Sequence, residues 1–346
     1  MARRTWKGRK QAGSGMARFL VGTFLVILVV AGAAGWLLLT PYGPTTETFV
    51  DLVPGDSTLR IGQKLEAAGV VRSQYAFDLL RAVKWGTLRA GEYRFDHPVT
   101  PVEAYEKIAR GEIYTVALTI PEGENIFDIA ARVEQAGFDT RQDFLNAATQ
   151  QVALVADLDP QAKSLEGYLF PDTYRFARHT KAAQITAAMV RRFRDVASEL
   201  GLKENVHRVV TIASLIERET AVDTERPLVA SVFENRLEKN MPLMTDPSVI
   251  YGLELEGNWR GSIYQSDLSR DTAYNTYLHP GLPPGPVANP GIPSLRAAMH
   301  PANTDYLYFV AAGSNAQGHS LFASTLDEHN RNVAGYRRAM KKAGAP

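Results

Sequence analysis

An uncharged stretch near the start of the chain, from Phe19 to Leu39, limits what this sequence can fold into more than any other feature. A helix that crosses the hydrocarbon core of a bilayer needs about 20 consecutive apolar residues, and this stretch supplies them. The residues before it carry six bases and no acid, and Lys and Arg are typical of the cytoplasmic side of a span. We therefore expect a basic cytoplasmic tail over residues 1–18, a single membrane-spanning helix over residues 19–39, and the remainder outside the cytoplasm.

A cleaved signal peptide is the alternative to a retained anchor. Ala31-Gly-Ala33 resembles the small-residue pattern at which such peptides are cut. However, the apolar run continues past it through Trp36-Leu-Leu-Leu39, which makes it longer than the apolar part of a usual signal peptide. The length therefore favours an anchor that stays in the chain.

The composition of the remaining chain excludes several classes of function. Beyond the basic tail, acids outnumber bases, so nothing indicates a nucleic-acid partner. The sequence contains no cysteine, which excludes disulfides and thiolate chemistry. It has no phosphate-binding loop, and its seven histidines show no metal-ligand spacing. We therefore expect no cofactor and no metal site.

A strand–turn–helix pattern occurs twice in the first half of the chain. One copy begins with the strand-like residues 48–53 and ends at Gly69; the other begins with residues 116–120 and ends at Gly137. Two copies are too few for a solenoid and suit small α+β modules. Mixed strands and helices follow them, so the expected fold class is α+β throughout.

The stretch from Val206 to Ala221 predicts a helix that carries a candidate catalytic acid. It contains no Gly or Pro, and an apolar stripe at helical spacing continues into Glu217. Burial of a carboxylate without a cationic partner raises its pKa, because the charged form loses solvation. An acid still protonated near neutral pH is what a glycosidic oxygen needs. The alternative is an ion pair between Glu217 and Arg218 or another base.

A glycosidase that uses two carboxylates needs a second acid at a set distance from the first. Asp246, in a Thr-Asp-Pro turn, is the candidate, and its alternative role is to cap that turn or a helical segment after Pro247. Glu219 lies about 200° around the helix from Glu217, so these two do not share a face. One acid without a clear partner favours a reaction without activated water, in which a sugar hydroxyl attacks within the substrate.

Regular patterns are sparse over residues 241–294, and several prolines stiffen this segment. A loop of this length usually forms a functional wall or a lid, so we expect it to line a substrate groove. Our candidates for substrate-binding residues are Thr245, Asp246, Asn275 and Tyr277, with structural roles as the alternative for each.

A series of motifs resembles the membrane-anchored endolytic murein transglycosylases of the MltG/YceG-like type. They occur in order along the chain as Leu165-Glu-Gly-Tyr-Leu-Phe-Pro-Asp-Thr-Tyr174, Ala213-Ser-Leu-Ile-Glu-Arg-Glu-Thr220, Val229-Ala-Ser-Val-Phe-Glu-Asn-Arg-Leu237, Leu243-Met-Thr-Asp-Pro-Ser-Val-Ile-Tyr-Gly252, Ala273-Tyr-Asn-Thr-Tyr277, Gly281-Leu-Pro-Pro-Gly285 and His300-Pro-Ala-Asn-Thr-Asp-Tyr-Leu-Tyr-Phe309.

The resemblance implies a single-pass inner-membrane protein with a LysM-like region over residues 45–157 and a catalytic domain over residues 158–346. It implies cleavage of peptidoglycan glycan strands between N-acetylmuramic acid and N-acetylglucosamine, with 1,6-anhydro ends as products. It also implies a role in ending nascent strands, which would bring the protein near peptidoglycan synthases.

The family's catalytic glutamate falls on Glu217 in this resemblance. We expect it to protonate the glycosidic oxygen and then to act as base while the muramic acid C6 hydroxyl attacks C1. Two alternatives stay open. One is a hydrolysing muramidase with Asp246 as second carboxylate, and the other is a non-enzymatic tether that only binds glycan.

Overall fold

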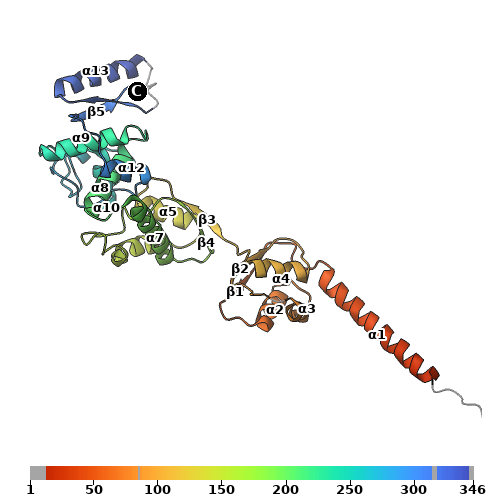
Figure 1. Cartoon of the computed structure of the whole chain (residues 1–346). Helices are drawn as coiled ribbons and strands as arrows, with labels where there is room; N and C mark the ends of the chain where they lie inside the picture. Colours follow the sequence, from red (N-terminus) through yellow and green to blue (C-terminus); the bar gives the residue numbers. More distant parts are fainter. Residues whose placement is uncertain (1–12, 85, 314–317, 343–346) are drawn as a thin grey trace, which may run out of the picture. The chain divides into compact units, whose positions relative to one another are not determined.

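The computed structural model describes residues 13–84, 86–313 and 318–342 (Figure 1). The chain folds into two compact units, Met1–Thr115 and Val116–Pro346, which we call the N-terminal and C-terminal units. The architecture is mixed α+β, as the sequence predicted. Most of the predicted cytoplasmic tail, residues 1–12, lies outside the described residues.

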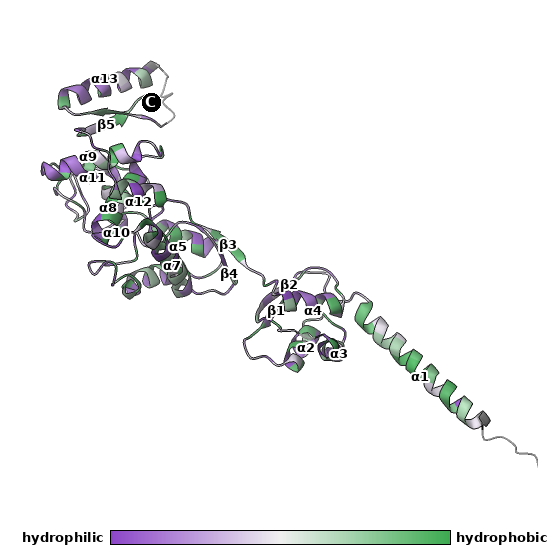
Figure 2. Cartoon of the chain, viewed as in Figure 1, coloured by the Kyte–Doolittle hydropathy of each residue, from purple (hydrophilic) through white to green (hydrophobic). Residues whose placement is uncertain are grey.

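Helix α1 (Gly13–Leu39) contains the apolar stretch. Within the described part of the chain, one helix, Gly15–Leu39, is long and apolar enough to cross a membrane, with a mean hydropathy of 2.3. Figure 2 shows it as a largely hydrophobic rod. Its large apolar side chains are exposed, which is costly in water and favourable in lipid. The helix has the properties of a membrane anchor, which a signal sequence shares.

Beyond α1, the described residues of the N-terminal unit form a two-stranded antiparallel sheet and three helices. Strand β1 (Thr48–Leu52) pairs with β2 (Gly91–Phe95), and the helices are α2 (Thr58–Ala67), α3 (Gln74–Val83) and α4 (Pro101–Arg110). Each helix begins at a hydroxyl cap whose oxygen accepts a backbone N–H, the strongest case being the Thr100–Glu103 capping box. Leu65, Phe77 and Ile108 then meet alternate residues of the strands in one apolar core.

In the C-terminal unit, the described residues are mainly helical and include two short antiparallel strand pairs. Strand β3 (Val116–Thr119) pairs with β4 (Thr173–Phe176), and β5 (Tyr308–Ala311) pairs with β6 (Ser320–Ala323). The helices are α5 (Ile126–Gln135), α6 (Arg141–Gln150), α7 (Ala182–Leu200), α8 (Val206–Glu219), α9 (Arg226–Glu238), α10 (Asp246–Leu255), α11 (Gln265–Leu268), α12 (Ile292–Met299) and α13 (Leu326–Lys342), and Val152–Leu154 forms a 3-10 turn.

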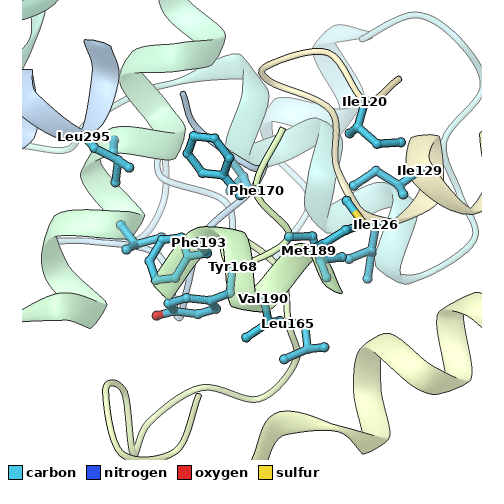
Figure 3. Packing of buried hydrophobic residues seen from close by; sticks show 14 of the residues in the cluster. Ile120, Ile126, Ile129, Leu165, Tyr168, Phe170, Met189, Val190, Phe193 and Leu295 are labelled. Atoms are coloured by element: carbon cyan, nitrogen blue, oxygen red, sulfur yellow. The ribbon is translucent and has the colours of Figure 1, made fainter. Parts of the chain in front are cut away.

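Helix α8 lies at the centre of this unit, packed against α9, α10 and α12. The residues from Val210 to Ile216 are all buried, so water reaches the helix mainly at its ends. Figure 3 shows the neighbouring part of the core, in which the Tyr168 ring meets Phe193 edge to face at 5.1 Å between centroids. The core therefore fixes the axis of α8 and leaves its last turn to carry chemistry.

The boundary between the units differs from the division at residues 157 and 158 that we expected. Strand β3 takes its partner from beyond that division, and Ile126 and Ile129 of α5 join the same apolar cluster as Leu165 and Phe193 (Figure 3). Both strand–turn–helix copies form as predicted, but they belong to different units. The local pattern predicts each strand and helix. Which unit a copy belongs to depends on the strand that it pairs with, and the local pattern does not contain that information.

Candidate functional site

Glu217 forms a buried ion pair near the end of α8. One carboxylate oxygen accepts a hydrogen bond from Arg226 Nη2 at 2.8 Å, and the other accepts one from the Gly291 backbone N–H at 2.9 Å. Both charged side chains are only 5% exposed. Arg226 also donates to Ser294 Oγ at 2.9 Å and pairs with Asp223. Glu217 therefore has a cationic partner, which is the alternative role that the sequence left open.

Glu122 lies beside this ion pair, in the turn that follows β3. A Cβ atom added to Gly291 would stand 1.8 Å from Glu122 Oε1, so the carboxylate rests directly on that glycine. The pKa of Glu122 is raised, first by burial and then by the negative charge of Glu217. No motif indicates Glu122, because Pro121-Glu-Gly123 has only the pattern of a turn.

Glu219, the last residue of α8, faces a different environment. It lines a cleft of about 170 Å³ together with Phe233, Arg236, Leu243, Met244, Thr245, Asp246, Tyr277 and Phe309. Burial and the nearby charge of Asp246 raise the pKa of Glu219 to about 7. The partial negative charge at the C-terminal end of a helix acts in the same direction. Glu219 can therefore hold a proton near neutral pH.

Three of the four predicted substrate-binding residues meet in this cleft. Tyr277 Oη donates a hydrogen bond to Asp246 Oδ1 at 2.7 Å, and burial together with this bond raises the pKa of Tyr277. Asp246 is exposed, while Thr245 is buried and its backbone N–H donates to Thr276 Oγ1 at 3.0 Å. That bond joins two segments that are about thirty residues apart in the chain.

Asn275, the fourth candidate, does not line the cleft. Its side chain is fully buried, and its Nδ2 donates to the backbone oxygens of Leu268 at 3.0 Å and Arg270 at 2.8 Å. Its Oδ1 accepts the backbone N–H of Tyr277 at 3.0 Å. Every one of these bonds serves the loop itself, so the contacts of Asn275 are those of a residue that positions Tyr277.

Arg236 supplies the positive charge of the cleft. Its guanidinium donates to the backbone oxygens of Leu307 at 2.7 Å and Leu243 at 2.8 Å, and it lies 5.3 Å from the centre of the Tyr308 ring. Burial lowers the pKa of Arg236, but an arginine stays charged in proteins. Carbonyl groups hold the side chain in place, so its charge opposes the raised pKa of Glu219 without a direct ion pair.

Two larger hollows, of about 450 and 430 Å³, lie elsewhere in the C-terminal unit. The acids there are paired: Asp139 accepts the Ala182 N–H at 3.0 Å, which lowers its pKa, and Asp267 accepts two bonds from Arg260. Neither hollow thus combines a cleft with an acid whose pKa is raised, as the cleft of Glu219 does. Among the residues that the structure describes, no group of three or more His, Cys, Asp or Glu side chains could hold a metal ion.

Comparison with known proteins gives a consistent set of relatives. The model of the YceG-like family matches residues 50–335. The endolytic murein transglycosylase of Bacillus subtilis is 34% identical over 329 residues, which cover 88% of this chain and 90% of the relative. The protein of the same name from Streptococcus pneumoniae is 29% identical over 90% of this chain, which spans only 64% of that relative. A crystal structure of a YceG-like protein from Listeria monocytogenes has a TM-score of 0.54 at 32% identity, covering 83% of this chain and 99% of that one.

Proposed function

The chain belongs to the YceG-like family, and from that premise we propose that it is an endolytic murein transglycosylase. It cleaves the bond between N-acetylmuramic acid and N-acetylglucosamine inside peptidoglycan strands and leaves 1,6-anhydro ends. The relatives' shared name supports the activity, and the raised pKa of Glu219 in its cleft is the observation that supports the chemistry.

We propose Glu219 as the general acid and keep Glu217, to which the resemblance assigns that role, as the alternative that the variants below distinguish. A general acid must reach the substrate and hold a proton at working pH. Glu219 meets both conditions, since it lines a cleft and has a pKa of about 7. Both oxygens of Glu217 are occupied by Arg226 and Gly291, and its side chain is nearly inaccessible. Its geometry fits a structural ion pair.

The reaction needs one carboxyl group in two protonation states. Glu219 gives its proton to the glycosidic oxygen as the bond to C1 breaks, and the charge of Arg236 stabilises the carboxylate that results. The carboxylate of Asp246 faces the same cleft and stabilises positive charge developing at C1. The muramic acid C6 hydroxyl then attacks C1 and returns a proton to Glu219. No water is consumed, and Glu219 ends as it began.

A hydrolysing muramidase is the second candidate, because Asp246 lies close enough to raise the pKa of Glu219. In that reaction Asp246 would act on a water molecule or attack C1 itself. The two candidates differ in their products, since hydrolysis leaves a reducing end and intramolecular attack leaves an anhydro end.

The remaining assignments follow the resemblance. We propose that α1 keeps the protein in the inner membrane with the N-terminus in the cytoplasm, and that the C-terminal unit works outside the cytoplasm on nascent strands beside peptidoglycan synthases. The LysM-like role, expected over residues 45–157, is proposed for the first copy in the N-terminal unit and includes glycan binding.

The test is digestion of uncrosslinked glycan strands by the full chain in detergent micelles, with products weighed by mass spectrometry. We expect internal fragments with anhydro ends, each one water lighter than the product of hydrolysis. Glu219→Gln should abolish release, and Glu217→Gln, on the same turn, is the matched control that should retain it when folded. Reducing ends would transfer the assignment to the muramidase, and strand binding without release would indicate a tether.

A further inference from the structure

Helix α3 carries apolar side chains on two faces. Ala76, Phe77 and Leu80 lie in the core of the N-terminal unit. On another face, Tyr75, Leu79 and Val83 follow one another at four-residue steps and are 69%, 44% and 72% exposed. Residues four apart lie above one another on a helix, so these three form one continuous stripe, here called the α3 stripe. A helix that is apolar on both sides is normally covered on both sides.

The start of α3 is joined to the end of the membrane-spanning candidate α1. Arg72, just before the cap of α3, has its guanidinium carbon 4.6 Å from the centre of the Trp36 ring and 4.8 Å from that of Tyr42. Its Nη1 also donates to Thr40 Oγ1 at 2.6 Å. Trp and Tyr gather where a span leaves the bilayer, and Arg next to them reaches lipid phosphates. This contact therefore sets the start of α3 at the depth of the membrane surface.

The polar residues of α3 leave the stripe itself uncharged. Asp78 and Arg81 are part-buried, and Arg81 is directed to the Tyr105 hydroxyl and the Lys84 backbone oxygen rather than outward. Lys84, at the end of the helix, pairs with Glu106. A short helix with one face on its own core and an uncharged aromatic and aliphatic face outward has the character of an interfacial segment. Helix α3 also contacts α1.

We propose that the α3 stripe lies in the headgroup and upper acyl layer of the same membrane that α1 spans, so that the N-terminal unit rests on the bilayer surface. The proposal rests on the anchor role of α1 in the proposed function. We take lipid as the occupant of the stripe because Arg72, just before α3, contacts Trp36 at the end of α1 and Tyr42 just after it. These contacts place the start of α3 next to the end of the candidate span.

The absence of cysteine makes the test direct, because any single introduced cysteine can carry a fluorescent label. The full chain is labelled in turn at Leu79→Cys, Val83→Cys, Val29→Cys in α1 and Asp51→Cys in β1, and reconstituted into phosphatidylglycerol–phosphatidylethanolamine nanodiscs. Lipids with a spin-label quencher near the headgroup or deep in the acyl chain report depth. We expect shallow quenching at least threefold stronger at residues 79 and 83 than at exposed Asp51, and deep quenching at Val29.

Each outcome decides one of the two claims. Quenching at residues 79 and 83 equal to that at residue 51, with Val29 deeply quenched, would overturn the docking and leave the anchor intact. Loss of quenching at Val29 would overturn the anchor and the docking together. Shielding at residue 83 that depends on protein concentration and not on quencher lipid would assign the stripe to a second copy of the chain and refute lipid.

A second pair of variants tests whether the stripe itself makes the contact. With the label at residue 83, Tyr75→Ser combined with Leu79→Ser should reduce shallow quenching at least twofold. Leu59→Ser on α2, also an exposed apolar side chain at 49% exposure, is the matched control and should leave it unchanged. An equal effect of both changes would contradict the proposal.

Discussion

Glu217 and Glu219 stand two residues apart on the last turn of α8, yet their carboxylates meet opposite conditions. The first is enclosed by a guanidinium and a backbone N–H, and the second opens onto a cleft beside another acid. Burial alone therefore does not distinguish the two carboxylates. Their partners do, because Glu217 faces a guanidinium, whereas burial and the nearby charge of Asp246 raise the pKa of Glu219.

The largest effect should come from Glu219→Gln. Removing a general acid typically costs about 10²–10⁴-fold in rate, so we expect release of anhydro fragments to fall about a thousandfold. Thermal unfolding should occur at the wild-type temperature or above, since no ion pair is lost. Product release is measured by mass spectrometry and unfolding by circular dichroism. Activity within tenfold of wild type would remove Glu219 from the mechanism.

Glu217→Gln should give the opposite pattern. Arg226 would keep its buried charge and lose its buried partner, a change that costs about 3 kcal/mol. The exposed Asp223 compensates for part of this loss. Denaturant unfolding should show the deficit, while the folded fraction should retain most of its rate, because a glutamine side-chain oxygen can still accept the Gly291 N–H and hold the last turn of α8. A stable protein without activity would instead restore Glu217 as the acid that the sequence suggested.

The stability of the protein should depend on pH through Glu219. The pKa of Glu219 is raised from 4.5 to about 7, so the folded state binds a proton more tightly than the unfolded state. Its contribution to stability is complete below pH 4.5 and is lost as pH rises through 7, by about 2 kcal/mol after allowance for solvent contact. The difference in unfolding free energy between wild type and Glu219→Gln, measured from pH 4 to 8, isolates this group from the other buried acids. The rate should fall over the same range as the acid ionises.

Tyr277→Phe should have the smallest effect. It removes one hydrogen bond to the exposed Asp246, worth about 1 kcal/mol, and keeps the ring in the cleft. We expect a change of a few fold in KM and little change in kcat. Unfolding temperature is the control, and a loss as large as that of Glu219→Gln would place Tyr277 among the reacting groups.

Much of the fold could be predicted from local pattern. The apolar span, the capped helices and α8 follow from spacing and from residues such as Thr100. Helix α10 was expected only as an alternative, a helical segment after Pro247, because Val249, Tyr251 and Leu253 are buried around several sides and leave no periodic stripe. A helix that is buried on several sides shows no apolar stripe of helical period, and that stripe is the pattern by which helices are predicted.

The roles of the candidate site residues stay a prediction, and the structure shows only where these residues lie. The stripe on α8 placed Glu217 inside the protein, but its partner Arg226 belongs to the next helix, and spacing within α8 does not contain that information. The 200° turn that separated Glu219 from Glu217 correctly excluded a shared face. Because of this rotation, Glu219 faces the second candidate site, the cleft, which is complete only when the loops have folded. Thr245, Asp246 and Tyr277 gather there because the backbone of Met244 takes a positive φ of 53° and Thr245 bonds to Thr276.

The ion pair of Glu217 has a mechanical consequence for its neighbour. The final turn of a helix has carbonyl groups without partners and tends to fray. Here the turn is clamped, since Glu217 is held from one side by Arg226 and from another by Gly291. Glu219 lies on the same turn, so the same bonds hold its backbone, although neither Arg226 nor Gly291 contacts its carboxylate. These bonds order the end of the helix before a sugar binds, which lowers the entropy cost of ordering Glu219 on binding.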